Sequence, residues 1–269
     1  MMEEVLPFKK NIRKMLVASS MSIYGEGAYR ASDGSVFSPS GRTELQLEQK
    51  TWDIMDPATG KALESIPTSE TKTLYPSSIY AIGKRDQEEM VLTVGKCYGI
   101  PALALRFFNI YGSRQALSNP YTGVAAIFSS RFLAGEQPLI FEDGNQKRDF
   151  VHVSDIVDGL CLAMRSDADQ ETFNLGSGQF VTIKRVAEIL SQEITKGRIQ
   201  AHVSGQFRAG DIRHCYADIS KAAGRLGYKP KYSFEKGVAE LVAWVRTQTR
   251  SADSFSQALK TARNQGIIR

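Results

Sequence analysis

A tyrosine and a lysine four residues apart are the side chains of this sequence best suited to proton transfer. Tyr80 and Lys84 share one face of any helix that contains them, because side chains at i and i+4 are neighbours on a helix surface. An ammonium beside a phenol stabilises the phenolate, and a tyrosine needs that help to act as a general acid or base near neutral pH. By itself the spacing is a weak signal, since such a pair on an exposed helix adds only about 0.2–0.5 kcal/mol of stability.

The elements around this pair are those of an α/β fold. The sequence predicts a helix over about 78–98 that ends before Gly99. Strands are predicted at about 14–19 and 102–107, and the second is so apolar that it fits a strand buried on both faces of a parallel sheet. Ser20 directly follows the first strand, where its hydroxyl can hydrogen-bond the same substrate oxygen as the tyrosine.

The rest of the chain alternates short apolar strands with segments of helical periodicity, which favours parallel strands. Residues 28–73 break this alternation, because they are polar and irregular, and we interpret them as an insertion or a long loop. The tail after Arg250 is weakly patterned and has no predicted role. Further helices are predicted at about 123–134, 154–164, 182–194 and from 233, with short strands at 138–141 and 173–175.

Composition and charge indicate a soluble protein of the cytoplasm. Of the 269 residues, 42% are hydrophobic and 23% charged, and the net charge of +5 is scattered along the chain, so nucleic acid is not an expected partner. The three cysteines are widely spaced and include no Cys-x-x-Cys pair, so no zinc site or disulfide framework is predicted. No apolar run reaches the length of a membrane span, and the run that follows Lys14 is too short for a signal peptide.

Six short strings occur along the chain in a characteristic order. They read ASSMSIYG (18–25), LRFFNIYG (105–112), RDFVHVSD (148–155), FNLGSG (173–178), RAGD (208–211) and ADISKA (217–222). Because of these strings and their order, residues 10–246 resemble the extended short-chain dehydrogenase/reductase family, especially its nucleotide-sugar 4-epimerases and dehydratases. The long insert and the string QALSNPYTG (115–123) are most similar to the subgroup that includes dTDP-rhamnose 4-epimerase and bacterial UDP-glucose 4-epimerases.

The resemblance implies a role for each residue of the candidate site. Ser20, Tyr80 and Lys84 would be the catalytic residues, and Lys84 would also bind the nicotinamide ribose of NAD. Arg148 and Arg208 would clamp the nucleotide diphosphate, since guanidinium forks match phosphate oxygens. The other implied contacts are Ser19 and Phe107 for the cofactor, and Ser22, Asn109 and Asp211 for the substrate.

The implied fold is the C-terminal part of a Rossmann-like, doubly wound parallel sheet with a smaller α/β substrate-binding domain. Residues 1–115 would form the partial Rossmann domain, and residues 116–269 mainly the nucleotide-sugar-binding domain, with strand 172–177 returning to the Rossmann sheet. His152 is expected to be structural. Some relatives carry a Cys-x-x-Cys element in the insert, but residues 56–60 contain no cysteine, and no metal is predicted.

The implied reaction is NAD-dependent epimerisation, most often at C4, of a UDP- or dTDP-linked sugar. Tyr80 would take the proton of a sugar hydroxyl while hydride passes to NAD, and the resulting keto sugar would be reduced on its other face. Dehydratases of the family carry an Asp-Glu pair directly after the catalytic hydroxyl. Met21 and Ser22 stand there in this sequence, which favours epimerisation or reduction over dehydration.

A complete family member begins with a strand, a Gly-x-x-Gly-x-x-Gly turn and a helix that together hold the cofactor pyrophosphate. This sequence has no such string, and by the resemblance Met1 falls within the helix before the fifth strand. We therefore expect a truncated family member whose isolated chain binds NAD poorly. The alternatives are a catalytically incompetent fragment, a nucleotide-sugar-binding subunit in a homodimer or a mixed dimer with a full-length homologue, and a dehydratase or reductase.

Overall fold

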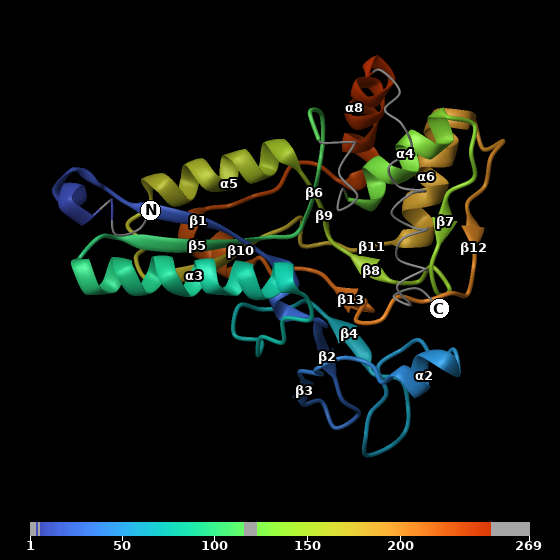
Figure 1. Cartoon of the computed structure of the whole chain (residues 1–269), viewed down its shortest axis with the longest axis horizontal. Coiled ribbons are helices and arrows are strands. Elements are labelled where there is room, and N and C mark those ends of the chain that lie inside the picture. Colours follow the sequence, from blue (N-terminus) through green and yellow to red (C-terminus); the bar gives the residue numbers. More distant parts are fainter. Residues whose placement is uncertain (1–3, 5, 116–122, 249–269) are drawn as a thin grey trace.

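The computed structural model describes residues 4, 6–115 and 123–248, so the tail after Arg250 and most of the string 115–123 lie outside the described residues. At its centre is a parallel sheet in the order β1 (Met15–Ser20), β5 (Ala102–Phe107) and β10 (Glu171–Leu175) (Figure 1). In the register of this sheet, the last residues of β1 and β10 both lie opposite the last residue of β5. The predicted α/β fold with parallel strands is therefore confirmed.

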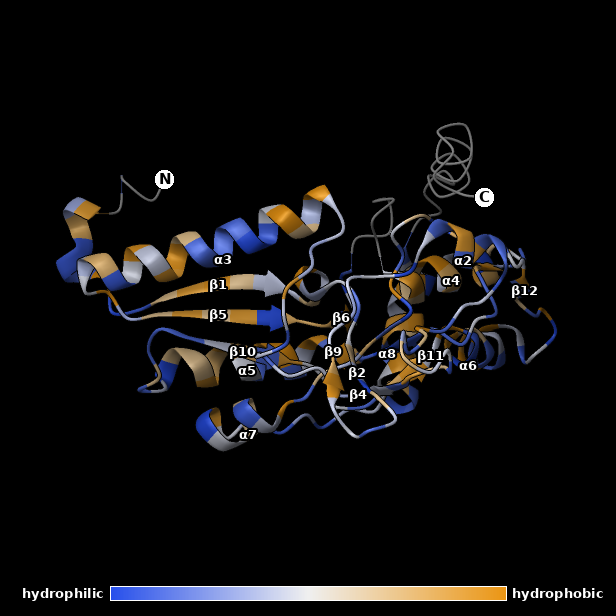
Figure 2. Cartoon of the chain, turned by 90° about the horizontal axis from the view of Figure 1, so that it is seen from below, coloured by the Kyte–Doolittle hydropathy of each residue, from blue (hydrophilic) through white to orange (hydrophobic). Residues whose placement is uncertain are grey.

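Helices cover both faces of this sheet (Figure 2). Helix α3 (Ile79–Tyr98) packs on β1 and β5; the Ser78 hydroxyl caps its start by accepting the Ala81 N–H at 3.1 Å, and Gly99 ends it with a positive φ of 66°. The opposite face is covered by α5 (Val153–Arg165) and α7 (Ser220–Leu226). Two short 3-10 helices flank β1, namely η1 (Leu6–Asn11) and η2 (Met21–Tyr24).

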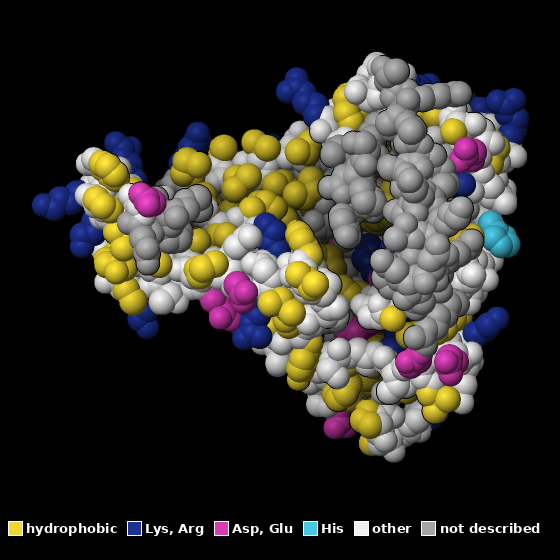
Figure 3. Space-filling model, in the orientation of Figure 1, with side chains coloured by type: hydrophobic (Ala, Val, Ile, Leu, Met, Phe, Trp, Pro, Cys, Tyr) yellow, Lys and Arg dark blue, Asp and Glu magenta, His cyan; other side chains and the backbone are white. Residues whose placement is uncertain are grey.

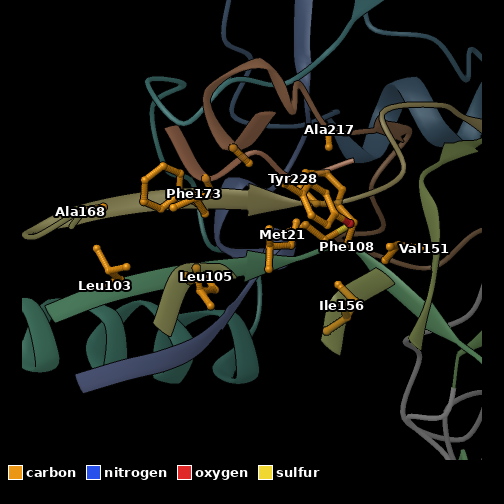
Figure 4. Packing of buried hydrophobic residues seen from close by; sticks show 14 of the residues in the cluster. Met21, Leu103, Leu105, Phe108, Val151, Ile156, Ala168, Phe173, Ala217 and Tyr228 are labelled. Carbon is orange, nitrogen blue, oxygen red and sulfur yellow. The ribbon is translucent and has the colours of Figure 1, made fainter. Parts of the chain in front are cut away.

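One buried apolar cluster joins the sheet to α5 and α7 (Figure 4). Leu103, Leu105 and Phe173 are fully buried in it, as expected for strands covered on both faces, and each such side chain stabilises the fold by about 1.5–3 kcal/mol. The outer face of α5 is also apolar, since Val157 is 50% and Met164 62% exposed, and hydrophobic side chains gather there in Figure 3.

The second half of the chain forms its own core beside the sheet. Helices α4 (Val124–Leu133), α6 (Ile183–Thr195) and α8 (Phe234–Thr247) pack together around buried side chains such as Leu190 and Leu241 (Figure 1). Among the described residues, no helix is both long and apolar enough to cross a membrane. The short strands of this half are β6 (Asn109–Tyr111), β7 (Leu139–Ile140), β8 (Lys147–Arg148), β9 (Phe150–His152), β11 (Val181–Thr182), β12 (His202–Val203) and β13 (His214–Cys215).

The segment 28–73 contains short regular elements that its sequence pattern did not indicate. It contains an antiparallel sheet in the order β3 (Val36–Phe37), β2 (Ala28–Arg30) and β4 (Glu64–Ile66), together with the short helix α2 (Glu44–Glu48). These strands are two or three residues long, and alternation of polar and apolar residues is recognisable only over about four or more residues. We refer to residues 28–73 as the insert below.

Candidate active site

Two serines in direct contact lie where the strand β1 ends and η2 begins. Ser20 caps η2, and its hydroxyl oxygen accepts the Ser22 hydroxyl at 2.7 Å and the Ser22 N–H at 3.2 Å. Ser20 is half-buried, so its own O–H remains able to reach a bound molecule. Ser19, one residue earlier, is buried, and its hydroxyl has no hydrogen-bond partner among the described residues.

Tyr80 and Lys84 occupy the first two turns of α3, on the side that meets β1. The Lys84 Nζ donates to the carbonyl oxygen of Ala18 at 2.9 Å and lies 6.0 Å from the centroid of the Tyr80 ring. Tyr80 itself is 60% exposed. The structure therefore brings the tyrosine and lysine to the strand end that carries Ser20, and Phe107 lies opposite Ser20 on the neighbouring strand.

A buried polar network that the sequence did not reveal anchors this end of α3. Glu88, one turn after Lys84, accepts hydrogen bonds from Arg106 of β5 at 2.5 and 3.1 Å. Arg106 also donates to the Tyr24 hydroxyl at 2.9 Å, and this hydroxyl donates to Asn174 at 2.7 Å. Burial raises the pKa of Tyr24 well above its ordinary value, so the phenol keeps its proton. The spacing of Glu88 four residues beyond Lys84 puts both on one face of α3, but it does not identify Arg106 as the partner of Glu88.

Three described residues could contact the nicotinamide end of an NAD molecule. The unpaired hydroxyl of Ser19, the ammonium of Lys84 and the exposed ring of Tyr80 lie together at the end of β1. A hydroxyl buried without a partner costs about 1–3 kcal/mol, and a polar ligand at this position would remove that cost.

Most N–H groups of the two Gly-x-Gly strings are bonded within the chain and are not free to bind a pyrophosphate. Gly25 and Gly27 donate their N–H groups to the carbonyl oxygens of Ser22 and His214. The second string is held by the buried carboxylate of Asp149, which accepts N–H groups of the string at 2.7 and 3.0 Å and that of Ala217 at 3.2 Å. Burial raises the pKa of Asp149 to about 6, although the donated hydrogen bonds act in the opposite direction.

Two side chains with unpaired polar atoms lie further along the chain. Asn109, in β6, donates its N–H to the carbonyl oxygen of Asp149 at 3.0 Å, and its Oδ1 is buried without a partner among the described residues. The guanidinium of Arg208 lies 4.7 Å from the centroid of the Phe141 ring, and its Nε is likewise buried and unpaired. Leaving a buried polar atom unpaired is costly, and a polar ligand that reached either atom would remove that cost.

The guanidinium of Arg148, an expected phosphate clamp, is already hydrogen-bonded to the main chain. Its guanidinium donates to the carbonyl oxygens of Lys147 and Arg213, each at 3.0 Å, and to that of Ile212. It also lies 3.6 Å from the carboxylate of Asp211, whose Oδ1 accepts the Ile212 N–H at 2.9 Å. Because β8 pairs directly with β13, Arg148 sits beside residues 212 and 213 and holds the turn that precedes β13.

Both buried histidines make contacts that serve the fold. The Nδ1 of His152 accepts the Ser154 N–H at the start of α5, and its ring stacks on Tyr232 at 4.3 Å. The Nδ1 of His214 accepts the Lys147 N–H at 3.0 Å, and burial lowers the pKa of this imidazole. In the part of the chain that the structure describes, no three His, Cys, Asp or Glu side chains are grouped so that they could hold a metal ion.

Comparison with known proteins relates this geometry to one family. The sequence model of the family "GDP-mannose 4,6 dehydratase" matches residues 60–241. The dTDP-L-rhamnose 4-epimerase of Burkholderia thailandensis is 35% identical over 238 residues, which cover 87% of this chain and 63% of that protein. The UDP-glucose 4-epimerase of Thermotoga maritima, solved with UDP-glucose, has a TM-score of 0.69 at 30% identity and covers 91% of this chain and 66% of its own. MoeE5, solved with UDP-glucuronic acid and NAD, has a TM-score of 0.69 at 26% identity, with 91% and 68% covered.

The region that this chain shares with its relatives covers only part of the length of each relative. The chain spans 63% of the rhamnose epimerase and 53% and 59% of the next two curated relatives. The matching family model nevertheless covers more than half of this chain, and the Thermotoga maritima epimerase superposes on 91% of it. On these grounds the chain belongs to the extended short-chain dehydrogenase/reductase family of nucleotide-sugar epimerases and dehydratases.

Proposed function

We propose that this chain carries the catalytic residues and the sugar-nucleotide site of an NAD-dependent 4-epimerase for a UDP- or dTDP-linked sugar. One observation supports the proposal most directly. The bond from Lys84 of α3 to Ala18 of β1 holds Tyr80 at the strand end that carries Ser20. The chemistry that NAD supplies when bound is reversible hydride transfer.

Each residue at this strand end has a role in the proposal. Tyr80 removes the proton from the sugar hydroxyl and later returns it, and Lys84 stabilises its phenolate. Ser20 donates a hydrogen bond to the same sugar oxygen. Ser19 and Phe107, at the ends of β1 and β5, contact the nicotinamide and its ribose.

The substrate residues divide into two groups. Arg208 and Asn109, which have unpaired buried atoms, contact the diphosphate and the sugar directly. Arg148 and Asp211, which are bonded to each other and to the main chain, hold the turn that carries Arg208. In this proposal the catalytic residues belong to a domain of residues 1–115, and the sugar-nucleotide contacts come mainly from residues 116–269.

Epimerisation is favoured over dehydration by the two residues after Ser20. Met21 is buried in the apolar cluster, and the Ser22 hydroxyl donates to Ser20. Neither side chain can serve as a general acid or base. The elimination of water needs one of each. The alternative is a binding subunit that pairs with a second copy or a homologue, and it is supported by the N–H groups of Gly25, Gly27 and Gly178, which are all bonded within the chain.

The test is to measure both binding and turnover with the purified chain. Calorimetry with UDP-glucose and dTDP-glucose measures binding, and proton NMR after incubation with added NAD detects the 4-epimer. We expect Tyr80→Phe to lower turnover by about 10²–10⁴-fold and Tyr98→Phe, at the other end of α3, to leave it unchanged. Binding without turnover in the unmodified chain would support the binding subunit, and neither binding nor turnover would contradict both functions.

A further inference from the structure

Four charged side chains form a buried cluster outside the catalytic residues. Arg42, Arg213, Glu26 and Glu142 are each at most 2% exposed. We call them the junction. Arg213 also pairs with two half-exposed carboxylates at the edge of the junction, those of Asp53 at 2.8 Å and Asp143 at 2.6 Å. Burying a charge costs several kcal/mol unless its partners are well placed.

The junction joins four segments, two from the first fifty residues and two from beyond residue 140. Glu26 follows η2 and stands six residues after Ser20, Arg42 belongs to the insert, and Glu142 follows β7. Arg213 directly precedes β13. The junction therefore links the catalytic strand end and the insert to the half of the chain that carries Arg208.

Arg42 makes the contact that matters most for the candidate site. Its Nη2 donates to Glu142 at 2.8 Å and to the carbonyl oxygen of Asp211 at 2.9 Å, and its Nη1 donates to the carbonyl oxygen of Trp52 at 3.0 Å. A side chain of the insert thus holds the main chain of the turn in which Arg208 and Asp211 lie. Only a planar fork with several donors can reach three such acceptors together.

The same turn is held on both sides of Arg208 by residues outside it. On the C-terminal side, Glu26 accepts the N–H groups of Arg213 and His214 at 2.6 and 3.2 Å. On the N-terminal side, the ring of Phe207 packs against that of Trp52, with centroids 6.4 Å apart. Arg208, between these supports, has the buried, unpaired Nε.

We propose that Arg42 is a positioning residue, which fixes the turn 208–211 through the Asp211 carbonyl oxygen and so directs Arg208 toward the nucleotide diphosphate. The diphosphate part of this inference rests on the proposed function, whereas the hold on the turn does not. A site is precise when the residues behind it are themselves locked by hydrogen bonds. The insert lies between Ser20 and Tyr80 in the sequence. The segment that separates the two catalytic residues therefore also holds the turn of Arg208.

The experiment compares two variants of Arg42 with a matched surface control. The double variant Arg42→Met with Glu142→Gln removes one cation and one anion together, and the glutamine side chain introduced there can still accept a hydrogen bond from Arg213. Arg42→Lys keeps the charge but cannot reach all three acceptors. The control is Arg185→Met with Glu188→Gln, an exposed pair on α6 whose side chains are 56% and 44% exposed.

Two measurements separate this inference from the proposed function. Hydrogen–deuterium exchange of the ligand-free chain reports the hold on the turn, and both Arg42 variants should speed exchange of residues 206–213 by about tenfold or more while β5 stays protected. Calorimetry with UDP and dTDP should show affinities lower by about tenfold in folded variants, with no change in the control. Unchanged exchange in both Arg42 variants would overturn the positioning role, even if one variant were unstable. If the unmodified chain binds neither nucleotide, the proposed function fails, and exchange alone decides whether Arg42 holds the turn.

Discussion

Ser22 donates two hydrogen bonds to the hydroxyl oxygen of Ser20, one from its own hydroxyl at 2.7 Å and one from its main-chain N–H at 3.2 Å. A serine hydroxyl has two acceptor positions and one donor. Both acceptor positions of Ser20 are therefore filled, and its remaining hydrogen bond is a donated one. A hydroxyl that can only donate suits a position at the sugar oxygen beside Tyr80. In the proposed reaction Tyr80 takes up and returns the proton, whereas Ser20 only donates a hydrogen bond.

We predict that Ser22→Ala lowers the turnover number of the epimerase by about tenfold, equivalent to about 1.4 kcal/mol in the transition state. The physical reason is that Ser20 regains a free acceptor position and can rotate its proton away from the substrate. Steady-state kinetics measure the effect, and Ser22→Thr, which keeps the hydroxyl, should restore turnover. Equal turnover in Ser22→Ala and the unmodified chain would contradict this donor role of Ser20.

Lys84→Met should lower turnover by about 10²–10³-fold and leave the affinity for UDP or dTDP unchanged. The substitution removes both the cation beside Tyr80 and the bond to Ala18, but neither group belongs to the proposed diphosphate contacts. Kinetics and calorimetry on the same preparation provide the comparison. Lys96→Met, at an exposed position near the end of α3, is the control, and a matching loss of activity there would refute a specific role for Lys84.

The buried ion pair under α3 should contribute strongly to stability. Glu88→Ala leaves the buried guanidinium of Arg106 without its main partner, and breaking such a pair costs about 3–5 kcal/mol. Glu89→Ala removes the exposed neighbouring pair with Arg85 and should cost less than about 1 kcal/mol. Urea denaturation of both variants measures the difference in the free energy of unfolding. Similar losses in the two variants would mean that the partners Arg106 keeps, the Tyr24 hydroxyl and the Glu70 carbonyl oxygen, are sufficient for it.

His214 should make stability depend on pH. Burial first, and then the nearby charges of Arg213 and Lys147, lower its pKa below the ordinary value of 6.5, while Asp53 acts in the opposite direction. The unfolded chain therefore takes up this proton first as the pH falls. The contribution of His214 is present above about pH 6.5 and is lost as the pH falls toward the folded pKa, with a slope of up to about 1.4 kcal/mol per pH unit.

The variant His214→Asn tests this contribution, because an asparagine oxygen can accept the Lys147 N–H but does not titrate. Unfolding free energies of both proteins should be measured between about pH 5 and pH 8. We expect the unmodified chain to lose stability faster than the variant as the pH falls below 6.5. Parallel curves for the two proteins would show that this imidazole does not carry the pH dependence.

Sequence reasoning was sufficient for the features that depend on local pattern. The parallel strands at 15–20 and 102–107 follow from apolar runs, and the shared face of Tyr80 and Lys84 follows from helical spacing. The strands of the insert were not predicted because strands of two or three residues are too short to show a period. The sequence also did not indicate the hydrogen bonds from Arg148 to main-chain carbonyl oxygens, because its residue type suggests only a phosphate contact.

By itself the sequence determined the fold class, the family and the tyrosine–lysine face. Only the tertiary structure decided which charges are buried and what they hold. Arg42 and Asp211 are 169 residues apart in the sequence, and Glu26 and Arg213 are 187 apart. The physical reason is that a buried arginine has the same local sequence signature as a solvated one. Its role depends on which acceptors the whole fold brings around it, and on the desolvation cost that those acceptors must offset.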